Sequence, residues 1–144
     1  MDCPLCLRVE ETKNGKYPFL ITEFKNSYLY LGEHQFYRGY CILVTKQHFR
    51  EMIDLPIEQR NELFSEMMMT QDLIQRVFNP KKMNLCSLGN VVDHIHWHFF
   101  PRYADDLNFK NPPWLQMHLF DDAKVNIQQM NELIRKLRAE IKLL

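Results

Sequence analysis

The stretch 94-HIHWHFFPRY-103 decides the fold, because three of the chain's six histidines occupy every second position in it. Alternate side chains of a β-strand point to opposite faces of the sheet. The pattern therefore predicts a strand that carries His94, His96 and His98 on one face, about 6.6 Å apart, and large apolar side chains on the core face. A row of imidazoles, which titrate near neutral pH and bind metals, predicts a site of chemistry.

The spacing of this row is compatible with two kinds of chemistry. Alternate histidines of a strand can supply two or three ligands to a catalytic metal ion. Alternatively, a neutral imidazole attacks an electrophile such as phosphorus while a hydrogen bond to its second nitrogen fixes the tautomer. A neighbouring histidine then assists the leaving group. Spacing alone does not separate the two interpretations.

The composition is typical of one soluble globular domain. The 144 residues are 46% hydrophobic and 25% charged, with 18 basic and 18 acidic side chains. This balance argues against a dedicated surface for nucleic acid or acidic membranes. No apolar run approaches the roughly 18 residues that span a membrane, and the first residues lack a signal-peptide pattern. We therefore expect a cytoplasmic protein that binds neither nucleic acid nor membrane.

The remaining sequence predicts an α+β domain with an antiparallel sheet of about five strands. Four stretches rich in β-branched and aromatic residues add to the histidine strand, at 19–24, 27–31, 40–44 and 83–88.

Two helices are predicted. One follows the central strand, opens at Pro56 and ends at Asn79-Pro80. The other covers about 122–142, and residues 104–121 before it indicate a loop. The apolar face of the first helix is expected to comprise Ile57, Phe64, Met67, Met68, Ile74 and Phe78. The corresponding stripe on the second comprises Ala123, Ile127, Met130, Ile134, Leu137 and Ile141.

A Cys-rich head, residues 1–8, contains the second chemical signal, Cys3-Pro-Leu-Cys6. Two cysteines at this spacing form half of a tetrahedral zinc site. A redox role would need a thioredoxin-like βαβ context, which the sequence lacks. The other interpretation is a free dithiol at a frayed terminus. Cys41 and Cys86 lie in strand patterns, where a buried thiol acts as a small apolar side chain.

Several segments together resemble the histidine triad (HIT) family of nucleotide hydrolases and transferases. The signature is His-φ-His-φ-His-φ-φ, where φ is apolar, and the order and spacing of further segments agree with it over residues 1–103. These segments are Asn84 on the preceding strand, Gly89-Asn90 before the first histidine, the central strand with its terminal Lys46-Gln47-His48, and the helix after Asp54-Leu55. The resemblance implies that residues 1–144 form a single domain of HIT-like fold, in a family whose members are typically homodimers.

The resemblance also implies an activity and the residues that perform it. The stretch 96–103 is particularly similar to bacterial dinucleoside polyphosphate hydrolases of the family, which favours substrates such as diadenosine tetraphosphate. His96 would attack the α-phosphorus and form a nucleotidyl-histidine intermediate that water hydrolyses. His98 would contact the phosphate and assist the leaving group. Related galactose-1-phosphate uridylyltransferases carry Gln at this position, so His98 favours hydrolysis over transfer.

Binding roles follow from the same resemblance. Asn84 and Asn90 would hold phosphate oxygens. Arg102 is a further candidate for phosphate, and Glu33 or Gln35 for the ribose. Zinc-bearing relatives imply a structural zinc site, with ligands Cys3, Cys6, His48 and His94.

Three departures from the family pattern bear on the substrate. Asn90 replaces the usual Gln. Val91 replaces a Ser or Thr, which puts phosphoramidate cleavage in doubt more than polyphosphate cleavage. Gly32 stands where several members carry an acidic residue or Asn for the ribose. The alternatives are a nucleotide-binding or signalling module with little turnover, a phosphoramidate hydrolase, and a hydrolase whose triad holds a catalytic zinc ion. Trp114, after two prolines, indicates either a pocket edge or a subunit contact.

Overall fold

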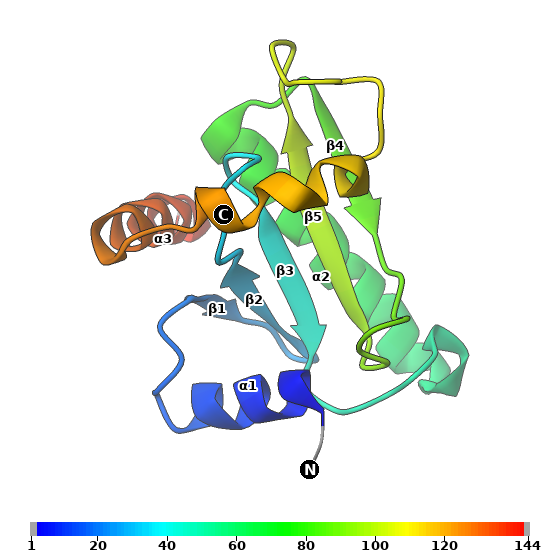
Figure 1. Cartoon of the computed structure of the whole chain (residues 1–144). Helices are drawn as coiled ribbons and strands as arrows, with labels where there is room; N and C mark the ends of the chain where they lie inside the picture. Colours follow the sequence, from blue (N-terminus) through cyan, green and yellow to red (C-terminus); the bar gives the residue numbers. More distant parts are fainter. Residues whose placement is uncertain (1–2, 143–144) are drawn as a thin grey trace.

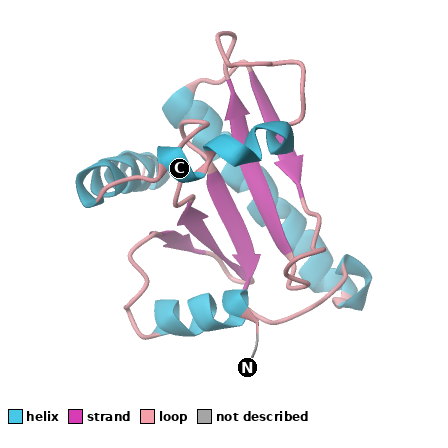
Figure 2. Ribbon diagram, in the orientation of Figure 1, coloured by secondary structure: helices cyan, strands magenta, loops and turns pink. Residues whose placement is uncertain are grey.

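Five strands form one antiparallel sheet in a computed structural model that describes residues 3–142 (Figures 1 and 2). The strand order is β1-β2-β3-β5-β4. The strands are β1 (Leu20–Glu23), β2 (Ser27–Leu31), β3 (Cys41–Thr45), β4 (Lys82–Cys86) and β5 (His96–Arg102). The sheet confirms the predicted α+β class with five antiparallel strands.

Helices cover both faces of the sheet (Figure 1). They are α1 (Pro4–Lys13), α2 (Ile57–Phe78) and α3 (Ile127–Ile141), with short 3-10 helices η1 (Met52–Asp54), η2 (Pro113–Leu119) and η3 (Asp121–Ala123). The main core lies between the sheet and the pair α2 and α3. Within the described residues, no helix is both long and apolar enough to cross a membrane.

The second face of the sheet carries the candidate site. On β5, His96 and His98 alternate with Trp97 and Phe99, which are buried in the main core. α1 packs over one end of this second face, and η2 crosses the other end (Figure 1). The two histidines therefore lie between α1 and η2, which are far apart in the sequence.

The predicted apolar face of α2 is partly wrong. Ile74 and Phe78 are buried as expected, but Ile57, Phe64 and Met68 are exposed. The face that packs on the sheet includes polar residues, among them Glu66, whose carboxylate accepts hydrogen bonds from the backbone of Asn26 and from the hydroxyl of Ser27 at the start of β2. An apolar pattern does not indicate the positions of a helix face where buried residues such as Glu66 and Thr70 are polar.

Three other expectations need correction at the ends of the chain. Residues 104–121 contain η2 rather than only loop, and α3 begins at Ile127, because the side chain of Asn126 accepts from the Gln129 amide and caps the helix there. The Cys-rich head is largely helical, since Pro4 opens α1 and Leu5 packs on the sheet. Residues 1 and 2 of that head lie outside the described residues.

Candidate functional site

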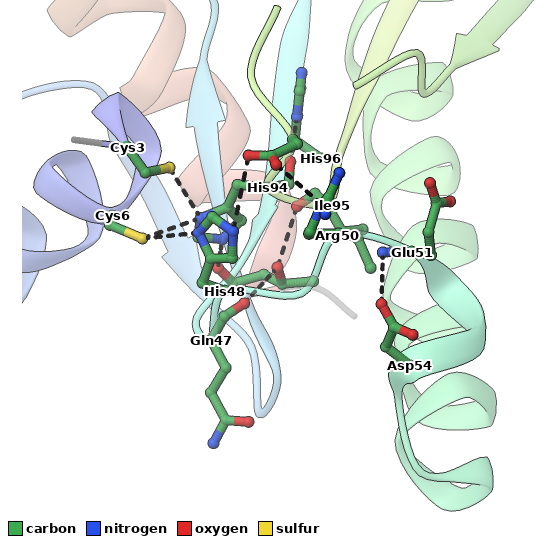
Figure 3. Close-up of polar contacts among 12 residues, drawn as sticks. Cys3, Cys6, Gln47, His48, Arg50, Glu51, Asp54, His94, Ile95 and His96 are labelled. Carbon is green, nitrogen blue, oxygen red and sulfur yellow. Dashed lines mark hydrogen bonds and ion pairs between the residues drawn. The ribbon is translucent and has the colours of Figure 1, made fainter. Parts of the chain in front are cut away.

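The three histidines do not share one strand. β5 begins at His96, so the predicted strand is wrong at His94. The backbone of the intervening Ile95 bonds instead to Phe49 and Thr45. His94 turns towards α1 (Figure 3), whereas the rings of His96 and His98 face each other edge to plane with centroids 4.9 Å apart. This is closer than the backbone spacing predicts, because the rings lean together.

The sequence-predicted metal ligands converge on one point. Cys3 precedes α1, Cys6 lies in its first turn, and His48 follows β3 (Figure 3). His94 is the fourth member of the cluster. Each of the four residues offers one ligand atom, and these atoms lie within 4.8 Å of one another. Nδ1 of His94 is 3.6 Å from Sγ of Cys3 and 3.4 Å from Sγ of Cys6. Nδ1 of His48 is 3.3 Å from Sγ of Cys6.

These separations fit a tetrahedral zinc ion. Zinc–sulfur and zinc–nitrogen bonds of about 2.3 and 2.0 Å at tetrahedral angles place sulfur and nitrogen ligands about 3.5 Å apart. The three distances between thiol and imidazole atoms scatter around that value. Two thiols and two imidazoles are a donor set that zinc prefers. The four side chains could therefore hold zinc with a closed coordination sphere.

Outer contacts orient the two imidazoles of this cluster. Nε2 of the buried His94 lies 2.8 Å from the carbonyl oxygen of Thr45 and donates to it, which leaves Nδ1 unprotonated towards the thiols. Burial also lowers the pKa of His94, which keeps the ring neutral. Nε2 of His48 faces the Asp93 carboxylate at 3.8 Å. Metal-ligating histidines commonly have such partners on their second nitrogen.

His96 is held by the backbone of its neighbour in the row. Its Nδ1 lies 2.6 Å from the carbonyl oxygen of His94. A carbonyl oxygen only accepts, so Nδ1 carries the proton and Nε2 keeps its lone pair. An imidazole in this tautomer can act as a nucleophile through Nε2. His94 thus faces the thiols with its side chain and fixes His96 with its carbonyl group.

His98 has the opposite tautomer. Its Nδ1 lies 2.7 Å from the hydroxyl oxygen of Tyr40, and burial of the phenol raises the pKa of Tyr40. If Tyr40 accepted from His98, its own buried hydroxyl hydrogen would have no acceptor among the contacts of the described chain. Tyr40 therefore donates, and His98 carries its proton on Nε2. Burial, with His96 and His34 nearby, lowers the pKa of His98 to about 3, so the ring is neutral.

Trp114 completes the aromatic surroundings of His98. Its indole packs edge-on against the imidazole with centroids 4.8 Å apart, and its Nε1–H donates to Sγ of Cys86 at 3.1 Å. Phe100 and Tyr40 stack on the same side of the sheet. Trp114 thus forms a wall of the site. No chemistry is predicted for Tyr40 and Cys86 from the sequence. Both belong to stretches that flank the histidine strand in the sheet, and both lie on the face that carries His98.

Arg102 does not have the role predicted for it. It is 1% exposed, and its guanidinium donates to the Asp106 carboxylate, to Oδ1 of Asn84 and to backbone carbonyls of 108–111. Its donors are used inside the protein, so Arg102 is not available to phosphate. It instead orients Asn84, which is half-buried on the histidine face of β4. Asn90 lies exposed in the loop between β4 and β5.

The two ribose candidates also have partners within the chain. The amide of Gln35 donates to the carbonyls of Gly32 and Tyr40 and accepts from the Gly39 amide, so Gln35 holds its own loop together and its ribose role stays a prediction with both of its N–H groups already used. Glu33 is exposed and accepts from Arg8 and the hydroxyl of Tyr17. Its ribose role stays a prediction.

Gly32 is explained by its neighbour Tyr40. A Cβ atom at Gly32 would lie 2.1 Å from a ring carbon of Tyr40. The aromatic ring that holds His98 therefore excludes any side chain where several HIT proteins carry a ribose ligand.

Comparisons with known proteins agree with this geometry. The sequence profile of the HIT domain family matches residues 14–105, more than half of the chain. A histidine triad protein from Marinobacter aquaeolei is 26% identical, with a TM-score of 0.74 over 87% of this chain and 89% of that one. A diadenosine triphosphate hydrolase from Plasmodium falciparum is 20% identical, with a TM-score of 0.68 over 88% and 78%.

A zinc-bound histidine triad family protein from Mycobacterium smegmatis is 22% identical, with a TM-score of 0.63 over 99% of this chain and 97% of that one. The family match and these neighbours confirm the histidine triad resemblance and the fold that it implied.

The tautomer of His98 gives a test with a matched control. Tyr40→Phe leaves a buried acceptor unpaired and should lower the free energy of unfolding by about 1–3 kcal/mol. Tyr37 has a buried hydroxyl with no hydrogen-bond partner in the described chain, so Tyr37→Phe should be neutral or stabilising. Urea denaturation measures both, and nitrogen NMR should show the Nε2–H form of His98 only while Tyr40 is present. Equal stability changes in the two variants would contradict the assignment.

Proposed function

The chain belongs to the HIT domain family, and from that premise we propose that it is a nucleotide hydrolase that cleaves a nucleoside 5′-phosphate linkage, with dinucleoside polyphosphates as its substrate class. The observation that carries the proposal is the pair of opposite tautomers: a lone pair on Nε2 of His96 beside an N–H on Nε2 of His98. One nitrogen suits attack on phosphorus, and the other suits a developing negative charge.

The proposed reaction has two steps. Nε2 of His96 attacks the α-phosphorus, a nitrogen–phosphorus bond forms, and the bond to the leaving phosphate oxygen breaks with its electron pair on that oxygen. The His94 carbonyl accepts from Nδ1–H of the now cationic imidazole. Water then attacks phosphorus, an oxygen–phosphorus bond forms, and the nitrogen–phosphorus bond breaks with its electron pair on Nε2 of His96. The nucleoside monophosphate leaves and one proton of the water is released to solvent.

The state of His98 favours a phosphoanhydride over a phosphoramidate. With a pKa of about 3, His98 is neutral at pH 7 and supplies a hydrogen bond rather than an acidic proton. A terminal phosphate with a second pKa near 6 leaves as an anion and needs only that hydrogen bond. An amine leaving group needs a proton. Val91, which is 98% exposed where many HIT proteins have a hydroxyl, adds no donor.

Asn84 and Asn90 are the proposed phosphate donors and Glu33 the proposed ribose contact. Asn84 is the best supported of the three, because Arg102 holds its carbonyl oxygen and leaves its amide N–H groups for a ligand. Asn90 lies in the loop that leads to the triad.

We propose that the cluster of Cys3, Cys6, His48 and His94 holds a structural zinc ion. The donor set and the distances support it. Zinc bound there would tie α1 to the segment that carries the triad. A catalytic zinc shared by the triad has less support, because Nδ1 of His94 faces the thiols. Reduced thiols are needed for such a site, which favours a cytoplasmic protein.

We further propose that residues 1–144 form one HIT domain that assembles as a homodimer. α1 and α3 lie outside the family match, before and after it in the chain, and both pack on the same sheet. Ile57, Phe64 and Met68 share the outer face of α2 and are 66%, 58% and 38% exposed. A second copy of the chain could bury this apolar stripe.

Replacing the nucleophile tests the hydrolase proposal. His96→Asn should lower the turnover of diadenosine tetraphosphate by at least about 10³-fold, the scale of loss when a nucleophile is removed, while nucleotide binding persists. His118→Asn, an exposed histidine on η2, serves as the control and should keep full activity. Equal rates for the parent and His96→Asn would contradict the assignment of His96 as the nucleophile. A parent protein that binds the nucleotide without turning it over would favour a binding module.

Metal analysis tests the zinc proposal. We expect about one zinc ion per chain, lost in Cys3→Ser together with a lower melting temperature and retained in Cys86→Ser. A parent protein purified without zinc would contradict the site. Activity that a chelator abolishes in a protein that stays folded, and that added zinc restores, would favour the catalytic-metal alternative.

The dimer is tested by sedimentation of the parent and two charge variants. Phe64→Glu should shift a dimeric parent towards monomer, because it places a charge within the buried stripe. Met69→Glu, which is half-exposed on another face of α2, should remain dimeric. A monomeric parent, or dissociation by both variants alike, would contradict this interface.

A further inference from the structure

A groove of about 570 Å³ runs along the edge strand β4. One side is formed by β4 itself, including Asn84 and Cys86, and the other by residues 109–114, which lead into η2. Figure 1 shows η2 crossing the sheet over β5, next to β4. The volume lies within the range of small-molecule sites, about 300–1,000 Å³. Neither the zinc cluster nor His96 lines this groove.

The groove and the triad share a wall. Trp114 lines the groove and also packs edge-on against His98. Cys86, which accepts from the Trp114 indole, lies directly opposite His98 in the β4–β5 pairing. A group bound in the groove is therefore one aromatic ring away from the histidine assigned to the leaving group.

The groove has cations at one end in a chain without net charge. Lys110 lines it and is exposed. Nζ of Lys81 lies 5.4 Å from the ring centroid of Phe109, another lining residue. Asp106, an acid near the groove, is largely buried and paired with the buried Arg102. This end of the groove therefore favours an anionic ligand.

Asn84 presents donors to the same space. Arg102 donates to its Oδ1 at 2.9 Å, and four other groups of the surrounding chain hold Arg102 in that position. The side of Asn84 that remains for the groove is its NH₂ group, which donates only. Fixed amide donors, lysines and the flat faces of Trp114 and Phe109 together match phosphate groups attached to an aromatic base.

We propose that this groove binds the leaving half of a dinucleoside polyphosphate. The distal phosphates would lie against Asn84 and Lys110, and the distal base against Trp114 and Phe109. The inference rests on the proposed hydrolase function and deepens it, because it explains how the site would select a substrate with a nucleotide on both sides of the scissile bond. A mononucleotide ester with a small leaving group would leave the groove empty.

The test compares two substrates in three variants. Diadenosine tetraphosphate reaches the groove, whereas the p-nitrophenyl ester of AMP does not. In Lys110→Ala and Phe109→Leu, kcat/KM for diadenosine tetraphosphate should fall about 10-fold, equivalent to about 1.4 kcal/mol, mostly through KM, and kcat/KM for the ester should not change. Lys16→Ala, an exposed lysine beyond α1, is the control and should change neither value.

The outcomes separate this inference from the proposed function. Parallel losses on both substrates, or no loss on either, overturn the groove assignment while the hydrolase stands. If the parent cleaves neither substrate, the proposed function fails. Calorimetric binding of diadenosine tetraphosphate to His96→Asn, with and without Lys110→Ala, then decides the groove: binding that is about 10-fold weaker without Lys110 supports it, and equal or absent binding overturns it.

Discussion

The rest of the site depends on two simultaneous contacts of His94, one through its ring and one through its backbone carbonyl group. Its ring faces the thiols of Cys3 and Cys6, while its carbonyl oxygen accepts from Nδ1 of His96. His94 therefore sets the position and the tautomer of His96, the proposed nucleophile. The ring of His94 is itself held between α1 and the Thr45 carbonyl of β3. A cluster that looks purely structural thus governs the chemistry two residues away, and zinc bound there would stiffen the arrangement.

The sequence predicted those parts of the molecule that follow from periodicity and spacing. Strand alternation placed His96 and His98 on one face, and CxxC spacing with the family resemblance brought Cys3 and Cys6 to His94. Periodicity gave wrong predictions at positions where polar side chains have specific partners elsewhere in the chain. His94 leaves the strand row for the cysteines, and Glu66 occupies a sheet-facing position of α2 because the turn before β2 supplies hydrogen bonds.

The roles of Arg102 and Tyr40 depend on contacts with residues that are distant in the sequence. A local sequence pattern does not indicate such contacts. Arg102 resembles a phosphate ligand in sequence, but Asn84 on β4 and the loop over 106–111 together accept from all its donors. Tyr40 belongs to an apolar run that the sequence marks only as a strand, yet its hydroxyl sets the tautomer of His98 and its ring requires glycine at position 32. The ribose contact that several HIT proteins have is absent at Gly32 for that reason.

The tautomer of His96 in the purified protein tests the central claim most directly. Long-range proton–nitrogen NMR on histidine-labelled protein distinguishes a protonated from an unprotonated ring nitrogen. The His94 carbonyl predicts a proton on Nδ1 and a lone pair on Nε2 of His96 at neutral pH. A proton on Nε2, or rapid exchange between the two forms, would contradict the account, because neither presents a fixed nucleophile to phosphorus.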